Sequence, residues 1–150
     1  MLSIVNAIPH QLLKRKTEFQ ECTPPPPGIP LPSLLSVSIS PDPVVPGGTD
    51  AFTITGTLTK PITSDYLLYV IFVDITIQPP APIQPIFNAK IPTGTSVNVV
   101  ENVPVPAKLP PEYGIIVAIV NDSVDPPDVI GCANTIVGGT TSIDSLAFPF

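Results

Sequence analysis

Apolar and polar residues alternate along two early segments of the chain, a pattern typical of half-buried β-strands. In residues 34–40 apolar residues alternate with serines, so that one face carries Leu35, Val37 and Ile39. Residues 51–58 alternate with threonine, and the face predicted to point inward carries Phe52, Ile54, Gly56 and Leu58. Side chains on a strand alternate between its two faces, so each segment predicts a strand with one buried face.

Residues 66–77 are apolar at nearly every position. The parity that we assign to the inner face carries Leu67, Tyr69, Ile71 and Val73. The other parity still carries Tyr66, Leu68, Val70 and Phe72. This segment therefore predicts a strand that is buried on both faces.

Three further strands are predicted at 95–103, 113–121 and 129–137. Their inward candidates are Val97 and Val99 in the first, and Ile115, Val117 and Ile119 in the second. Proline clusters separate the segments, and they leave no room for long helices because proline is excluded from helix interiors and central strands. Short strands between proline-rich turns predict an all-β fold, an antiparallel immunoglobulin-like sandwich of two sheets.

The composition is apolar for a chain of this size. Hydrophobic residues make up 43% and charged residues 12%, against about 25% charged in an average globular protein. The longest apolar run, residues 66–77, contains Asp74 and is too short to span a bilayer. The excess apolar surface must therefore be covered by a tightly filled core, by a partner protein or by a bound apolar ligand.

The charged and catalytic residue types exclude several function classes. The net charge is −6 with six basic residues, so we expect no nucleic-acid partner. There is one histidine, His10, and no phosphate-binding or nucleophile motif, so we predict no enzyme, cofactor or metal. The acids fall in turn-like segments, and a calcium loop at 122–128 is a less favoured alternative to a plain turn.

The first fifteen residues look like processing sequence. Residues 1–7 resemble the end of a signal peptide, and residues 8–15 end in the dibasic pair Lys14-Arg15, typical of a propeptide. A short disordered start and a solvated charge cluster are the alternatives. We therefore predict a domain at 16–137, with a loosely held tail at 138–150 that is rich in glycine, serine and threonine.

Two cysteines stand at the ends of the central region. The spacing of Cys22 and Cys132 fits no metal site, so we predict a disulfide, with two free buried thiols as the alternative. A disulfide implies an oxidising compartment, and the glycosylation sequon Asn121-Asp122-Ser123 agrees with secretion. The expected location is outside the cell or in a vacuolar or lysosomal lumen.

The order of short motifs over residues 19–137 resembles the ML lipid-recognition domain, especially the fungal phosphatidylglycerol/phosphatidylinositol transfer proteins. The motifs are Glu21-Cys22, residues 35–43 followed by Pro46-Gly47, residues 54–60 before Ile62, residues 91–94, 103–106 and 111–114, and Ile130-Gly131-Cys132. The resemblance implies sheets that splay around an apolar cavity holding acyl chains or a sterol. It also implies that the first and last cysteines join across the sandwich. The family's middle cysteine pair is absent, with Ala89 and a proline-rich loop in its place, which predicts a looser loop and an altered entrance.

The resemblance implies a monomeric, non-enzymatic protein that binds and transfers one phospholipid or sterol and contacts membranes transiently. The predicted cavity lining is Phe52, Ile54, Leu58, Leu67, Tyr69, Ile71, Val73, Val97, Val99, Ile115, Val117 and Ile119. Lys60 is a candidate head-group contact, against the alternative of a solvated turn lysine. Two other functions stay open: an interaction or adhesion module with a filled core, and a secreted effector that uses its bound lipid to engage a protein.

Overall fold

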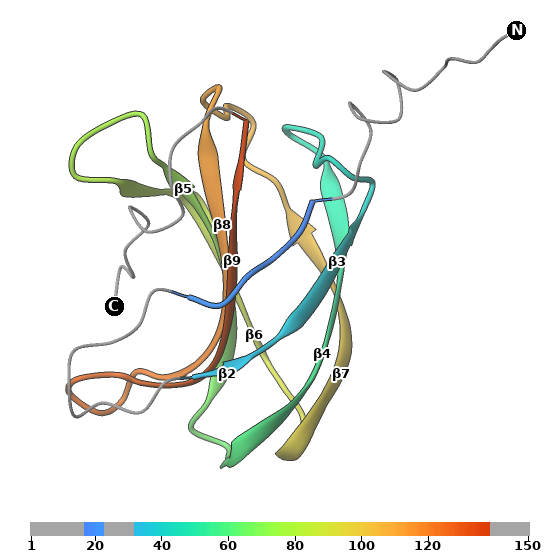
Figure 1. Cartoon of the computed structure of the whole chain (residues 1–150), viewed down its shortest axis with the longest axis vertical. Coiled ribbons are helices and arrows are strands. Elements are labelled where there is room, and N and C mark those ends of the chain that lie inside the picture. The colour runs from blue at the N-terminus through green and yellow to red at the C-terminus, as the bar shows by residue number, and fades with distance from the viewer. Residues whose placement is uncertain (1–16, 23–31, 139–150) are drawn as a thin grey trace, which may run out of the picture.

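The computed structural model describes residues 17–22 and 32–138, which form two facing β-sheets (Figure 1). The five-stranded sheet has the order β2-β9-β8-β5-β6, and the three-stranded sheet has the order β3-β4-β7. Paired strands run antiparallel, except that β2 is parallel to β9. The strand bounds are β2 Ser33–Leu34, β3 Ser36–Ser40, β4 Thr49–Ile62, β5 Leu67–Asp74, β6 Ala81–Lys90, β7 Gly94–Pro104, β8 Tyr113–Asn121 and β9 Asp128–Val137.

The connections give an immunoglobulin-like topology. Hairpins join β3 to β4, β5 to β6 and β8 to β9 within a sheet, whereas the chain changes sheet after β2, after β4, after β6 and after β7. Two antiparallel sheets joined by such crossovers are the hallmark of this sandwich. The prediction of an all-β, two-sheet sandwich is confirmed.

The structure changes the predicted strands in two places. The first segment divides at Leu35, whose N–H donates to the carbonyl of Cys132 at 3.2 Å as the chain passes from one sheet to the other. The proline-rich segment that we expected to be a loose loop is instead strand β6. It contains Pro82 and Pro85 and lies at the edge of its sheet, where a missing N–H interrupts no inner ladder.

An apolar cluster of buried side chains lies between the sheets. Phe52 and Ile54 of β4 lie in it with Phe72 of β5 and Ile115 of β8. The packing is tight at Gly131, where an added Cβ would lie 3.1 Å from methyl groups of both Leu35 and Leu58. Around Gly131, therefore, the side chains of the two sheets meet directly.

A second apolar cluster lies on the other face of the five-stranded sheet, and it corrects the predicted orientation of β5. This outer cluster contains Tyr69, Ile71 and Val73, and Leu67 packs against it. The assignment of these four residues to the inner face is therefore wrong. The inner face of β5 carries Leu68, Val70 and Phe72 instead. Both parities of β5 are apolar, so its sequence does not show which one faces inward; the packing of this sheet against the three-stranded sheet decides it.

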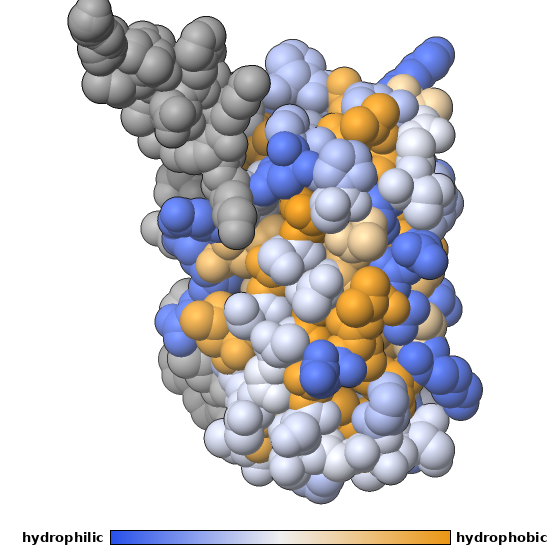
Figure 2. Space-filling view, turned by 90° about the vertical axis from the view of Figure 1, so that its right-hand side faces the viewer, coloured by the Kyte–Doolittle hydropathy of each residue, from blue (hydrophilic) through white to orange (hydrophobic). Residues whose placement is uncertain are grey.

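The outer face of the three-stranded sheet is different in character. Figure 2 views the molecule from this side and shows many pale residues of intermediate hydropathy, with hydrophobic ones between them. Its outward positions include Ser36, Ser38, Thr53, Thr55 and the exposed Val100 of β7. This alternation is typical of an antiparallel sheet with one solvated face.

Several predictions concern residues outside the described ranges: the signal-peptide remnant at 1–7, the dibasic pair, His10 and the tail beyond Gly138. In the described part of the chain, no helix has the length and apolar character needed to cross a membrane.

Replacing Gly131 with alanine should lower the free energy of unfolding by about 1–3 kcal/mol, because the new methyl group must displace neighbours in a filled interior. Chemical denaturation measures this loss. Gly56→Ala is the matched control, since its added Cβ would meet Leu35 at an ordinary 3.4 Å; we expect it to change stability by less than about 1 kcal/mol. Equal stability of the two variants would contradict the close packing at Gly131.

Candidate ligand-binding groove

Residues 17–22, which we call the strap, cross the seam between the two sheets (Figure 1). At one end, the N–H and the hydroxyl of Thr17 donate to the two carboxylate oxygens of Asp42, at 2.7 and 2.6 Å. Asp42 lies in the connection from β3 to β4. At the other end, Gln20 and Asn134 of β9 exchange two backbone hydrogen bonds, at 2.8 and 2.9 Å. The strap is therefore attached to both sheets.

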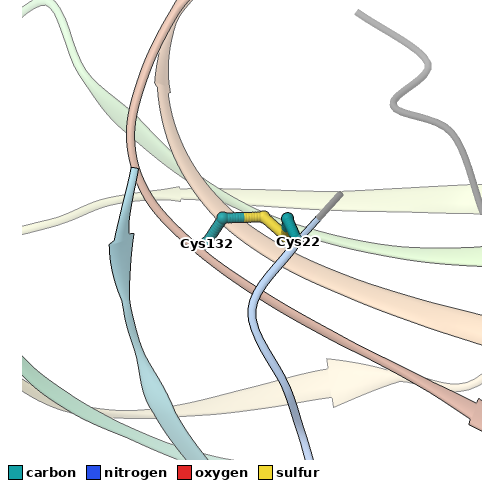
Figure 3. The surroundings of a disulfide bond; sticks show 2 residues. All are labelled: Cys22 and Cys132. Atoms are coloured by element: carbon teal, nitrogen blue, oxygen red, sulfur yellow. A yellow bond between two sulfur atoms is a disulfide. The ribbon is translucent and has the colours of Figure 1, made fainter. Parts of the chain in front are cut away.

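The predicted disulfide between Cys22 and Cys132 is confirmed, and it fixes the end of the strap (Figure 3). The two Cα atoms are 6.0 Å apart. Both cysteines belong to the cluster on the outer face of the five-stranded sheet. The bridge therefore joins the strap to β9 on the outer face of the five-stranded sheet. The family resemblance had implied a bridge across the sandwich, and the structure differs from it in this respect.

A groove of about 720 Å³ lies between the strap and β3. Apolar side chains come from the strap, from the point where the chain changes sheet and from β3. The described residues that line it are Thr17, Glu18, Phe19, Leu34, Leu35, Ser36, Val37, Ser38, Ile39, Asp42 and Gly56. Its size falls within the range of about 300–1,000 Å³ that is usual for small-molecule sites.

The polar groups of the groove include two carboxylates. Among the described lining residues, Glu18 and Asp42 are the charged ones. Ser36 and Ser38 add hydroxyl groups that can donate or accept hydrogen bonds. This part of the wall therefore suits a polar group that donates hydrogen bonds better than one that carries negative charge.

The twelve predicted lining residues lie elsewhere. Eight of them are in the cluster between the sheets or pack against it: Phe52, Ile54, Leu58, Val97, Val99, Ile115, Val117 and Ile119. The other four are on the outer face of β5. None of the twelve is among the described residues that line the groove.

Lys60 lies near the end of β4 and is also not among the described lining residues. Its ammonium is 3.5 Å from a carboxylate oxygen of Asp128, and its side chain is 49% exposed. The other oxygen of Asp128 accepts a hydrogen bond from the Tyr66 hydroxyl at 2.5 Å. Burial, and then this hydrogen bond, raise the pKa of Tyr66 to about 12. Lys60 thus belongs to a cluster that fastens β9 to β4 and β5.

A buried carboxyl group lies at the other end of β4. Asp50 is 1% exposed, and neither of its carboxylate oxygens has a hydrogen-bond partner among the described residues. Burial, and then the charge of Asp42, raise the pKa of Asp50. Burial and the charges of Asp50 and Asp42 also raise the pKa of Tyr113, whose ring contacts Phe72. The carboxylate of Asp42, which anchors the strap, is therefore close enough to Asp50 to make the charged form of Asp50 less favourable.

Sequence reasoning missed the strap residues and Asp50. The hydrogen bonds of Thr17 join positions 25 residues apart, which no local pattern reveals. For Asp50 a clue existed, since it shares the parity of Phe52 and Ile54 and so had to point inward.

Asp50→Asn should stabilise the protein at pH 7 by on the order of 1 kcal/mol, because an uncompensated charge is removed from the interior. The folded-state pKa of Asp50 lies above its ordinary value of 3.8, so the charged carboxylate lowers the stability of the fold at pH values above the folded-state pKa. This loss of stability becomes smaller as the pH falls through the folded-state pKa, and it is absent at pH values below 3.8. Urea denaturation across pH should show the advantage of the variant shrinking in acid; a constant difference would contradict this account.

Replacing both Cys22 and Cys132 with alanine should lower the free energy of unfolding by about 4–5 kcal/mol in the chain-entropy model, because the bridge closes a long loop. Denaturation of the oxidised wild type and the double variant measures the loss. Reduced wild type is the control and should match the double variant. A loss below about 1 kcal/mol would contradict a large contribution of the bridge to stability.

No model of a known protein family matches this chain, and no curated protein matches it. The resemblance to the ML domain therefore depends on the order of the sequence motifs alone. It stays a prediction.

Proposed function

We propose that this protein is a non-enzymatic carrier of a single lipid molecule, which it binds in the groove between the strap and β3. The observation that carries the proposal is the groove itself, about 720 Å³ in volume, with Phe19, Leu35, Val37 and Ile39 in its lining. Burying a ligand's methylene groups against such side chains stabilises the complex by about 0.8 kcal/mol for each group. An apolar chain or ring system is the ligand type that gains most from this wall.

The charges of the lining favour a lipid with an uncharged polar end. The carboxylates of Glu18 and Asp42 would repel a phosphate and accept hydrogen bonds from a hydroxyl group. Of the two lipid classes expected from sequence, a sterol or similar neutral lipid therefore fits the described lining better than phosphatidylinositol or phosphatidylglycerol.

The proposed site differs from the enclosed inter-sheet cavity expected from sequence. The facing side chains form one cluster there, and at Gly131 they leave no room for a further methyl group. The lipid would instead lie at the seam, with the strap as one wall. Leu34, a lining residue that is 47% exposed, would contact a membrane briefly during transfer.

A second function is favoured by the close packing at Gly131. A sandwich whose sheets pack directly against each other can serve as an interaction or adhesion module, with its surface rather than its core as the binding site. Native mass spectrometry of the purified protein separates the two proposals. A carrier retains one lipid per chain, whereas the interaction module retains none.

Leu34→Asp should weaken the binding of a fluorescent sterol by at least about tenfold, since it places a charge in the apolar wall of the groove. Fluorescence titration measures the affinity. Val100→Asp is the matched control, because Val100 is also exposed but lies on β7, outside the described lining. Failure of the wild type to take up either the sterol or fluorescent phosphatidylglycerol would overturn the carrier, and equal loss in both variants would overturn the proposed site.

A further inference from the structure

The sequence Asn121-Asp122-Ser123 has no part in the groove, and its geometry suggests a separate role. Asn121 is the last residue of β8 and is partly exposed, while Asp122 and Ser123 are exposed in the loop that leads to β9. The loop continues to β9, which begins at Asp128. The three residues are therefore at the surface, at one end of the sandwich.

The hydrogen bonds of this loop leave the Asn121 amide nitrogen available. The Oδ1 atom of Asn121 accepts two hydrogen bonds from Ser123, one from its N–H at 3.0 Å and one from its hydroxyl at 2.5 Å. Among the described residues, none accepts a hydrogen bond from Nδ2 of Asn121. The carboxylate of Asp122 accepts a hydrogen bond from the Tyr69 hydroxyl at 2.5 Å, so it is held toward β5.

We propose that Asn121 carries an N-linked glycan. The triplet is the acceptor sequence for this modification, which takes place in the oxidising compartment where the Cys22–Cys132 bridge would form. The co-substrate is an oligosaccharide linked to a lipid diphosphate. Nδ2 forms a bond to C1 of the first sugar, the bond from C1 to the diphosphate oxygen breaks, the lipid diphosphate leaves, and Nδ2 loses one proton to a base of the transferase.

The glycan would lie away from the groove. Asn121 pairs with Asp128 at the start of β9, whereas the lining residue Leu34 pairs with Cys132, four residues further along the strand. At about 3.4 Å per residue, this separation is roughly 13 Å. A glycan at Asn121 would cover the exposed Val124 of the same loop and leave the groove open. The inference is thus independent of the carrier function.

The test uses the full chain, secreted from a eukaryotic host behind a cleavable signal peptide. Intact mass and peptide mapping should show a glycan at Asn121, and peptide N-glycosidase should remove it and leave aspartate. Asn121→Gln and Ser123→Ala should lose the glycan completely. Ser123→Thr is the matched control and should keep it, because threonine supplies the same hydroxyl.

An unmodified Asn121 in the secreted wild-type protein would overturn the proposal. Loss of the glycan in Ser123→Thr would overturn the role given to the hydroxyl. Ligand binding is measured separately, on protein before and after enzymatic removal of the glycan. Equal sterol affinity of the two forms is expected, and a difference of tenfold would show that the glycan reaches the groove.

Discussion

The disulfide between Cys22 and Cys132 is the constraint on which the position of the strap, and with it the shape of the groove, depends. The strap contributes only six described residues, too few to bury much apolar surface by themselves. Its covalent attachment to β9 and its hydrogen bonds to Asp42 place it across the seam. The groove exists because this segment is tied down at both ends, some distance from the edge of β3.

The five-stranded sheet explains why so much apolar sequence fits into one small domain. Both faces of β5 and β8 are apolar, so the sheet has an inner cluster against β3-β4-β7 and a second cluster on its outer face. The high mean hydropathy of +0.41 is therefore accounted for by two layers of buried side chains, one on each face of this sheet. An excess of apolar residues does not by itself indicate an internal ligand site.

Polar interactions concentrate at the two ends of the sandwich. At one end, Asp128 holds Lys60 and Tyr66, and the neighbouring hairpin loop carries the Asn121 triplet. At the other end, Asp42 anchors the strap near Asp50, whose carboxyl has no hydrogen-bond partner among the described residues. The apolar middle of the sandwich stabilises the fold, while the polar side chains at its ends are the basis for the inferred ligand class and modification.

The sequence by itself determined the fold class, the disulfide and six of the strands, namely β3, β4, β5, β7, β8 and β9. The strict alternation in residues 51–58 and the proline clusters were sufficient to predict strands and the turns between them, because these patterns reflect local backbone geometry and one-sided burial. Only the tertiary structure decided which face of β5 points inward, that residues 81–90 form an edge strand, and that the groove lies under the strap. Each of these features depends on which segments lie side by side in the fold. A strand that is apolar on both faces does not show which face meets the other sheet. The wall of the groove formed by Thr17 and Asp42 joins positions that are far apart in the chain.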